Sequence, residues 1–252
     1  MFDQNPLRET LESGGAAIGA VVRSGSPILV EVYGEVGLDF AFVDLEHGGQ
    51  SPFDSDGLEH LHRAATVGGI EPLVRKVLDT GVRSVIVPRV KTAEEVRRTV
   101  EASRFDYDGG PGERGFVSGG QASAWGRDLD GYLDRQDDTA LVGVIVETAE
   151  ALANVEEILS VPDLGFVFVG HRDLTVSLGH RSDVDHPEVR AAVDRVLEAA
   201  LDAGVPVGRV ASDPADARAG VERGFQFFLV GYELHAVREV FGRWVSEFHG
   251  ED

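Results

Sequence analysis

The sequence of 252 residues contains no cysteine, only two lysines and no long apolar run. The absence of cysteine excludes disulfides, thiolate metal ligands and cysteine nucleophiles. No segment reaches the roughly 18 apolar residues of a membrane span, so a membrane is not an expected partner. Neither a Walker lysine nor a glycine fingerprint on a strand-to-helix turn is present, which argues against a nucleotide-binding site.

The chain is strongly acidic. Asp and Glu outnumber Lys and Arg by 44 to 23, which gives a formal net charge of −21. This charge would repel nucleic acids and anionic lipids, so small metabolites are the expected partners. Lys76 and Lys91 are the only lysines, and a composition poor in lysine and rich in carboxylates suits concentrated salt, where screening weakens the repulsion. We therefore expect a halophilic source, the alternative being an ordinary acidic enzyme.

The length and the composition predict one domain over residues 1–252. The hydrophobic fraction of 42% is sufficient for a buried core, and no Pro- or Ser-rich stretch divides the chain. Residues 1–6 contain neither a basic region nor an apolar segment, so no secretion signal is expected. The expected location is the cytoplasm.

Apolar, β-branched runs alternate with stretches of helical period, which is typical of βα units around a parallel sheet. The predicted fold class is therefore α/β, as a (β/α)8 TIM barrel. The eight expected strands are 17–22, 40–44, 71–74, 84–88, 141–147, 165–169, 207–210 and 227–231. A last amphipathic segment, 234–248, carries an apolar stripe that could pack on its own barrel or on a neighbouring subunit.

One connection of this predicted barrel is abnormally short. Only residues 76–82 separate Arg75, at the end of the third expected strand, from Arg83, which precedes the fourth. A parallel crossover usually needs about ten to twelve residues or more. Three explanations stay open: a shortened or distorted helix, a misplaced third strand, or a chain that lacks a segment.

Two acidic residues at strand ends are the expected metal ligands. Glu147 and Asp173 each follow an apolar strand, and in a barrel these ends meet at one mouth. A buried carboxylate is costly unless a positive charge compensates it. Oxygen ligands favour Mg²⁺ or Mn²⁺, with Co²⁺ as a further option, over zinc. The alternative is that each acid only caps a helix, and His171 is either a nitrogen ligand or simply exposed.

The expected general base is His47. Asp44 precedes it by three residues, close enough to orient the imidazole and raise its basicity, although a histidine without a role remains an alternative. Glu46 could point to either face.

Arg75 would bring a positive charge suited to a carboxylate or an enolate oxygen. Lys91 could instead form a Schiff base, but it lies next to the predicted cap at Thr92, which favours a surface position.

Several segments together resemble the HpcH/HpaI aldolase family, and the resemblance runs from about residue 14 to residue 248. They are Val43-Asp44-Leu45-Glu46-His47, Val87-Pro88-Arg89-Val90 with Thr92-Ala93-Glu94-Glu95, Gly112-Glu113-Arg114-Gly115, Val146-Glu147-Thr148, Asn154, and Gly170-His171-Arg172-Asp173-Leu174 with Ser177. Members of this family are metal-dependent class II aldolases that cleave or form 4-hydroxy-2-oxo acids, with pyruvate as product or donor.

This resemblance implies a role for each site residue. His47 with Asp44 corresponds to the base dyad, Glu147 and Asp173 to the metal ligands, and Arg75 to the arginine that contacts the pyruvyl oxygens. The substrate carboxylate is expected at the backbone around Gly170, Arg172 and Asp173. The metal would bind the 2-oxo acid and stabilise the enolate, while His47 takes the proton of the 4-hydroxyl. The partners are thus pyruvate and an aldehyde, and the family implies a homo-trimer or homo-hexamer with exchanged last helices.

The chain also departs from the family pattern. Gly170-His171-Arg172-Asp173 replaces a turn of small residues, Ile145 replaces a frequent glutamine, and the segment after Arg75 is about ten residues short. These departures leave the aldehyde undetermined. The altered turn and the shortened segment also support an alternative function, a catalytically silent relative that binds a 2-oxo acid or serves as an assembly subunit.

Overall fold

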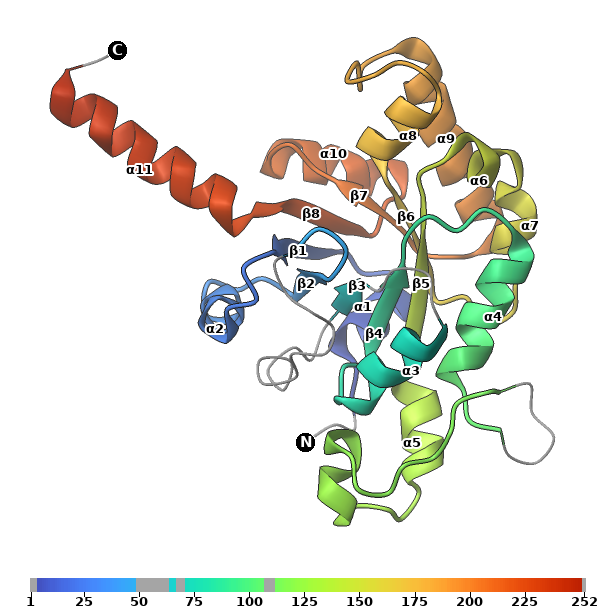
Figure 1. The fold of residues 1–252 in the computed structure, drawn as a ribbon. Coiled ribbons are helices and arrows are strands. Elements are labelled where there is room, and N and C mark those ends of the chain that lie inside the picture. Colours follow the sequence, from blue (N-terminus) through green and yellow to red (C-terminus); the bar gives the residue numbers. More distant parts are fainter. Residues whose placement is uncertain (1–3, 49–63, 67–70, 107–111, 251–252) are drawn as a thin grey trace.

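The structure is a computed structural model that describes residues 4–48, 64–66, 71–106 and 112–250 (Figure 1). Its strands are all parallel and hydrogen-bonded in chain order, and β8 also pairs with β1, so the sheet closes on itself. Seven strands have four to six residues, whereas β3 has three. The strands are β1 (Ala17–Val22), β2 (Phe40–Asp44), β3 (Ala64–Thr66), β4 (Ser84–Val87), β5 (Leu141–Val146), β6 (Phe166–Val169), β7 (Val207–Val210) and β8 (Phe227–Tyr232).

Helices precede, connect and follow these strands. They are α1 (Pro6–Glu12), α2 (Pro27–Glu35), α3 (Glu71–Asp79), α4 (Ala93–Ser103), the 3₁₀ helix η2 (Gln121–Gly126), α5 (Tyr132–Thr139), α6 (Ala149–Ala153), α7 (Val155–Leu159), α8 (His171–Ser177), α9 (Pro187–Ala203), α10 (Pro214–Arg223) and α11 (Glu233–His249). At the start of α4, the Thr92 and Glu95 side chains each accept the other residue's N–H, which confirms the predicted capping box. Among the described residues, no helix is long and apolar enough to span a bilayer.

The predicted fold class, a (β/α)8 barrel with an abnormally short connection between strands 3 and 4, is wrong as stated. Residues 71–74, the expected third strand, begin helix α3, and the third strand is Ala64–Thr66. Helix α3 therefore provides the crossover to β4. The residues described between β2 and β3, 45–48, contain no helix, so the described chain is an α/β fold without a regular eightfold repeat of strand and helix.

The physical reason for the misplaced strand is an ambiguous apolar pattern. Leu73 and Val74 form a short apolar run that is compatible with a strand, but Val74, Val77 and Leu78 also recur at helical spacing. In the structure these last three side chains are buried against the outside of the sheet, together with Val82. Burial of that helical face determines the outcome, because it extends over more residues than the four-residue strand could bury.

The inside of the sheet is filled by aromatic side chains. Phe40, Phe166 and Phe227 lie at the first positions of their strands, and the ring of Phe227 contacts the other two edge to face. Glycines make room for them: a Cβ on Gly143 would lie 2.3 Å from the Phe166 ring. Helix α1 packs its buried leucines on the same cluster and covers the amino ends of the strands. The carboxyl ends are therefore left as the open end of the sheet.

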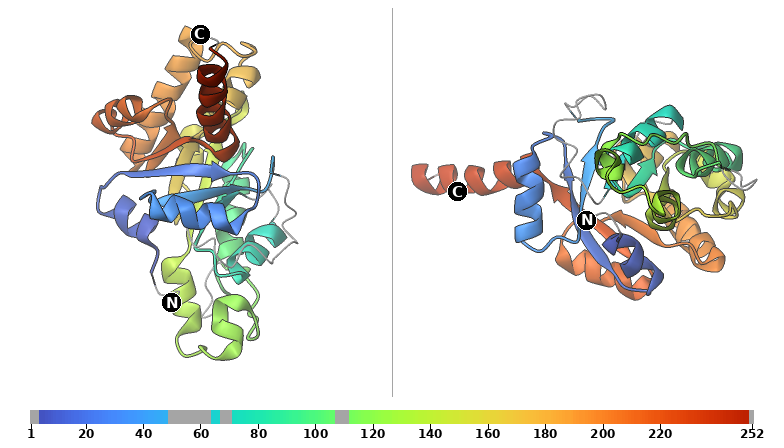
Figure 2. Two further views of the ribbon diagram at one scale, coloured as in Figure 1. Left: turned by 90° about the vertical axis from the view of Figure 1, so that its left-hand side faces the viewer. Right: turned by 90° about the horizontal axis from the view of Figure 1, so that it is seen from below.

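Helix α11 does not pack along the sheet. It leaves the end of β8 and extends away from the strands, also when the molecule is seen from below (Figures 1 and 2). Its apolar side chains are exposed by 37–85%, and they are Leu234, Val237, Val240, Phe241, Trp244, Val245 and Phe248. Of the two alternatives that the sequence leaves open, packing on its own barrel is therefore not realised.

We expect the acidic surface to make folding salt-dependent. On α9, Asp194, Glu198 and Asp202 lie on the face opposite the buried valines. Raising KCl from 0.1 to about 1 M shortens the Debye length from about 10 to about 3 Å and weakens repulsion among such charges. A gain of about 1–2 kcal/mol would raise the thermal midpoint by roughly 2–8 °C for a chain of this length. A midpoint that does not rise, or that rises equally with an uncharged solute of the same osmolality, would contradict this expectation.

Candidate active site

A cavity of about 950 Å³ lies at the carboxyl ends of the strands. Its wall contains charged residues from the ends of β1, β2, β5 and β7 and from the start of α8. They are Arg23, Asp44, Glu46, His47, Glu147, Arg172, Asp173 and Arg209. Phe42, Ile145, Phe168 and Leu229 form an apolar floor. All of the site residues predicted from the sequence line this cavity, except Arg75.

Glu147 occupies the centre of the charged wall. It directly follows β5 and is only 6% exposed, and its Oε1 accepts the N–H of Arg89 at 2.7 Å. The donor is held in place by an uncommon backbone conformation, since Arg89 has a positive φ of 58° just after β4. Two neighbouring strand ends thus fix the position of one buried carboxylate.

Three carboxylates influence one another at this point. Burial raises the pKa of Glu147 to about 7, against the effect of the Arg89 N–H, and the negative charges of Asp173 and Glu46 raise it further. Asp173 lies exposed in the first turn of α8, and Glu46 follows β2. The structure therefore places Glu46, which the sequence left open, on the side of the cavity. A buried acid with two acidic neighbours is a site that a cation would stabilise.

The donor set fits a divalent cation that prefers oxygen. Glu147, Asp173 and Glu46 offer carboxylate oxygens on the wall of one cavity, and the chain has no thiolate. Mg²⁺ and Mn²⁺ take such ligands and keep water in their remaining positions.

His171 also lines the cavity and is half-buried. Burial lowers the pKa of its imidazole, and the positive charge of Arg209 lowers it further. Burial and this charge thus favour the neutral form of the imidazole.

The absence of a side chain at Gly170 leaves room for the side chain of Glu147. An added Cβ at residue 170 would lie 2.6 Å from the Cβ of Glu147 and 2.8 Å from its Oε2. The φ of Gly170 is −82°, a value open to any residue, so the requirement for glycine here is steric. Gly170 thus acts on the site through the position of the Glu147 carboxylate.

We expect Gly170→Ala to displace that carboxylate and to weaken the binding of Mn²⁺ by about 10–100-fold, as for other residues that orient a metal ligand. Titration calorimetry with Mn²⁺ measures this effect. Gly34→Ala in α2 is the matched control, because no atom lies within 4 Å of the added Cβ. Equal Mn²⁺ affinities for the two variants would show that the contact with Glu147 has no such role.

Asp44 is buried at the end of β2, but its contacts differ from the prediction. Its Oδ1 accepts the backbone N–H of Glu46 at 3.1 Å and that of His47 at 2.8 Å, and its Oδ2 accepts Nε of Arg23 at 3.1 Å. Among the described residues, no hydrogen bond joins this carboxylate to the imidazole of His47. Asp44 therefore fixes the turn that carries His47 and holds Arg23 at the wall.

The His47 side chain is 63% exposed, and its Nε2 lies 3.9 Å from Oε2 of Glu46. The carboxylate that accompanies this imidazole is thus Glu46 and not Asp44. A ring that is exposed on the wall of the cavity can exchange protons with solvent and reach a bound ligand. The position suits a general base.

Arg75 is not at the site, which corrects its predicted position at a strand end. It lies in α3, where its guanidinium is 3.7 Å from the Glu113 carboxylate. Lys91, the alternative Schiff-base residue, does not line the cavity either, and its Nζ lies 3.0 Å from Oε2 of Glu150. The Schiff-base alternative therefore has no lysine at this cavity.

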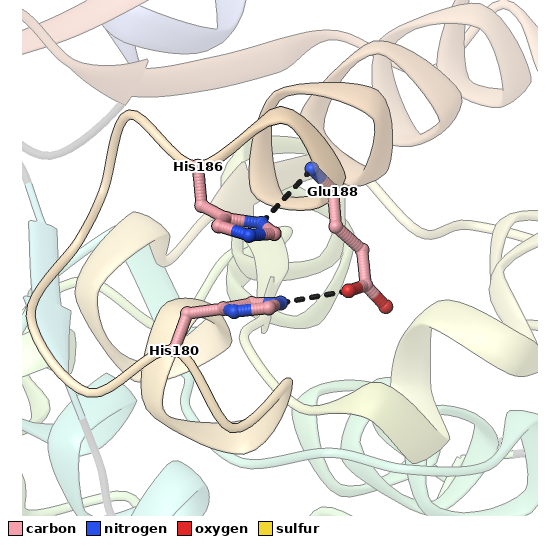
Figure 3. A group of neighbouring side chains, drawn as sticks. All are labelled: His180, His186 and Glu188. Atoms are coloured by element: carbon pink, nitrogen blue, oxygen red, sulfur yellow. Dashed lines mark hydrogen bonds and ion pairs between the residues drawn. The ribbon is translucent and has the colours of Figure 1, made fainter.

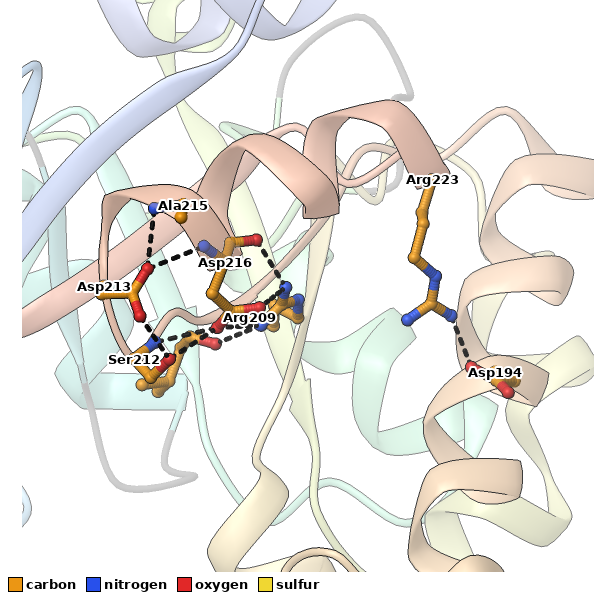
Figure 4. Close-up of polar contacts among 8 residues, drawn as sticks. Asp194, Arg209, Ser212, Asp213, Ala215, Asp216 and Arg223 are labelled. Atoms are coloured by element: carbon orange, nitrogen blue, oxygen red, sulfur yellow. Dashed lines mark hydrogen bonds and ion pairs between the residues drawn. The ribbon is translucent and has the colours of Figure 1, made fainter.

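The wall formed by β7 and α10 carries paired charges (Figure 4). Arg209 donates to both carboxylate oxygens of Asp216, at 3.0 and 2.5 Å, and these bonds lower the pKa of Asp216 to about 2. Arg223 donates through one nitrogen to a single carboxylate oxygen of Asp194 in α9. Within the described residues, Arg172 and Arg190 line the cavity without an ion pair, so their charges are the ones available to an anionic ligand.

Two contributors at this site were missed from the sequence. Arg23 follows the apolar strand β1, and an arginine directly after such a run was an available signal for a residue at the carboxyl end of the sheet. The N–H of Arg89 had no such signal, because the sequence does not show that this residue adopts a positive φ. Both donate hydrogen bonds to carboxylates predicted for the site.

Known proteins resemble this chain in sequence and in fold. A model of the HpcH/HpaI aldolase/citrate lyase family matches residues 64–239. A hydroxypyruvate/pyruvate aldolase of Cupriavidus necator is 35% identical over 240 residues, covering 91% of this chain and 87% of the relative. A 2-keto-3-deoxy-L-rhamnonate aldolase of Escherichia coli K12 is 32% identical with the same coverage. A solved structure of a family protein from Burkholderia cenocepacia J2315 has a TM-score of 0.90 at 30% identity, covering 98% of this chain and 100% of the other.

The family model spans more than half of the chain, and the named relatives align over nine-tenths of it. Both of these relatives are aldolases, which marks the present chain as a carbon–carbon lyase. The chain belongs to the HpcH/HpaI aldolase/citrate lyase family.

Proposed function

We propose that this protein is a metal-dependent class II aldolase that cleaves or forms 4-hydroxy-2-oxo acids, with pyruvate as product or donor and an aldehyde as the other partner. The observation that carries the proposal is the placement of Glu147, Asp173 and Glu46 on the wall of one cavity together with the exposed imidazole of His47. The relatives named as aldolases of pyruvate and of a 2-keto acid support the same reaction class.

Glu147 and Asp173 would hold the metal, Mg²⁺ or Mn²⁺, with Co²⁺ as a further option. When bound, such a cation supplies Lewis-acid stabilisation of the negative charge that develops on the keto oxygen. The Arg89 N–H keeps one oxygen of Glu147 in a fixed direction, and Gly170 leaves room for the other. The carboxylate of Glu147 is thus positioned before the substrate arrives.

The proton of the substrate's 4-hydroxyl would go to His47. Glu46, with its Oε2 3.9 Å from the ring, stabilises the imidazolium that forms. Arg172 and the neighbouring backbone at Gly170 and Asp173 would receive the substrate carboxylate. Arg23, held by Asp44, replaces Arg75 as the cation nearest to the end of β2. The apolar floor limits the access of water to the reacting carbons.

The direct test is pyruvate release from a panel of 4-hydroxy-2-oxo acids in high-salt buffer, with Mg²⁺ or Mn²⁺ and after treatment with EDTA. We expect release that requires the metal and returns when it is restored. Pyruvate trapping by borohydride is expected to fail, because no lysine lines the described cavity. Release that persists in EDTA would contradict the metal-dependent route.

The alternative function, a catalytically silent relative, was supported by two features of the sequence, the altered turn and the short connection. The structure removes one of them. The connection between the third and fourth strands is not abnormally short, because the third strand is Ala64–Thr66 and α3 belongs to the crossover. The enlarged turn 170–173 remains, and its Arg172 lines the cavity.

We also propose one domain over residues 1–252 and a cytoplasmic location, as expected from the sequence.

The proposal includes assembly into a trimer or hexamer through α11. This helix exposes seven large apolar side chains and extends away from its own sheet (Figure 1). An apolar stripe of this length is typical of a helix that packs on a neighbouring subunit.

We expect the double variant Phe241→Glu and Trp244→Glu to dissociate the assembly, because two charges would be buried in an apolar interface. Sedimentation velocity measures the change. Arg243→Ala, on the same helix and already paired with Glu247, is the control that should leave the assembly intact. An unchanged sedimentation coefficient for the double variant would exclude α11 from the interface.

A further inference from the structure

The loop between α8 and α9 brings two histidines and a glutamate together outside the active site (Figure 3). His180 follows Gly179, whose positive φ of 88° turns the chain at the end of α8. His186 caps α9, with its Nδ1 accepting the N–H of Glu188 at 3.3 Å. The sequence gives no signal for this arrangement, because the three residues are spread over nine positions.

The donor atoms of these three side chains lie close enough together to bind one metal ion. The imidazole rings of His180 and His186 stack with centroids 3.6 Å apart, and Nε2 of His180 lies 2.7 Å from Oε2 of Glu188. One donor atom from each residue lies within 4.8 Å of the other two. In a tetrahedral zinc site with bonds of about 2.0–2.1 Å, ligand atoms are about 3.3 Å apart, so modest side-chain rotations are sufficient.

We infer that His180, His186 and Glu188 form a second metal site, selective for Zn²⁺ over Mg²⁺. Two imidazoles and one carboxylate are the donors that zinc and its neighbours Co²⁺ and Ni²⁺ prefer, whereas Mg²⁺ takes oxygen donors. The carboxylates of the active site have the opposite preference. The two sites of this chain thus differ in the metal that they select.

Such a site has a structural consequence for the cavity. Val184 and Asp185, between the two histidines, line its wall, as does Arg190 in the first turns of α9. A zinc ion would join the loop at residue 180 to the start of α9 at residues 186 and 188. This bridge would hold the cavity wall in one conformation and stabilise the folded chain. The inference does not depend on the proposed aldolase reaction.

The test uses the full-length protein with Glu147→Gln and Asp173→Asn, which removes the charged ligands of the active site. Zn²⁺ binding to this background is measured by titration calorimetry, and Co²⁺ binding by its visible absorption. We expect one Zn²⁺ per chain, a raised thermal midpoint in its presence, and a Co²⁺ spectrum of low coordination number. Mg²⁺ should produce no shift of the midpoint at equal concentration.

The variants are chosen to keep the loop folded. His186→Asn retains an efficient helix cap, and His180→Gln retains a donor for Glu188. Each should weaken Zn²⁺ binding by at least about tenfold, since each removes one of three ligands. His235→Ala is the matched control, because His235 also lies next to a glutamate, 3.7 Å from Glu239, but is not grouped with a second histidine among the described residues. Absent Zn²⁺ binding in the background protein, or equal binding by all these variants, would overturn the inference.

Discussion

Replacing Glu147 with glutamine is expected to lower kcat/KM for pyruvate release by about 10³-fold, because Lewis-acid stabilisation contributes several kcal/mol and each 1.36 kcal/mol is a factor of ten. Glutamine keeps an oxygen that can accept the Arg89 N–H but removes the charge that binds the cation. The measurement is steady-state kinetics at saturating Mn²⁺. Glu150→Gln is the control, since that acid pairs with Lys91 outside the cavity.

Glu147→Gln should also change the stability of the folded chain. This effect distinguishes a variant that has lost a metal ligand from one that has lost its fold. The pKa of Glu147 is raised to about 7 by burial, so in metal-free protein its ionisation favours the unfolded chain. This cost is absent below the ordinary carboxyl pKa of about 4.3, grows as the pH rises, and is complete above about 7. The glutamine variant should therefore be more stable than the parent at pH 8 in EDTA, and similar at pH 4. A variant that is inactive and also less stable at pH 8 would contradict this account.

Replacing His47 with alanine is expected to lower kcat by about 10²–10⁴-fold, the usual contribution of a general base. The affinity for Mn²⁺ should change little, because the proposed metal ligands, Glu147 and Asp173, lie after β5 and in the first turn of α8. Burst and steady-state kinetics measure the first effect, and calorimetry measures the second. His249→Ala, at the exposed end of α11, is the control.

A second variant tests which carboxylate assists His47. Glu46→Gln removes the negative charge beside the imidazole and should change the pH profile of kcat/KM, whereas a merely structural role would leave that profile in place. A kcat for His47→Ala within twofold of the parent would exclude this histidine as the base.

The sequence predicted most of the sheet, because seven of the strands are apolar, β-branched runs with few alternatives. Strand β3 could not be found in this way. Its three residues, Ala64–Thr66, form no run, and the neighbouring segment Leu73-Val74 is more apolar. Two adjacent apolar residues fit the period of a strand as well as that of a helix. Only the burial of Val77 and Leu78 on the same face shows that the segment is helical.

Of the candidate site, the strand ends were predictable and the directions of the side chains were not. Glu147 and Asp173 reach the cavity because they follow β5 and β6 closely, and the carboxyl ends of the strands lie at the same end of the sheet. The spacing of three residues between Asp44 and His47 was read as a contact between side chains. An aspartate before a turn instead accepts the backbone N–H groups two and three residues later. The carboxylate beside the imidazole of His47 is therefore that of Glu46.

We propose that Glu147 and Asp173 hold a divalent cation beside His47 and that this group forms the enolate of pyruvate. The most direct measurement is the entry of solvent deuterium into the methyl group of pyruvate, followed by proton NMR without any aldehyde. We expect exchange that needs Mg²⁺ or Mn²⁺ and is lost in Glu147→Gln. Exchange at the parent rate in EDTA or in Glu147→Gln, or no exchange in protein that binds both metal and pyruvate, would contradict it.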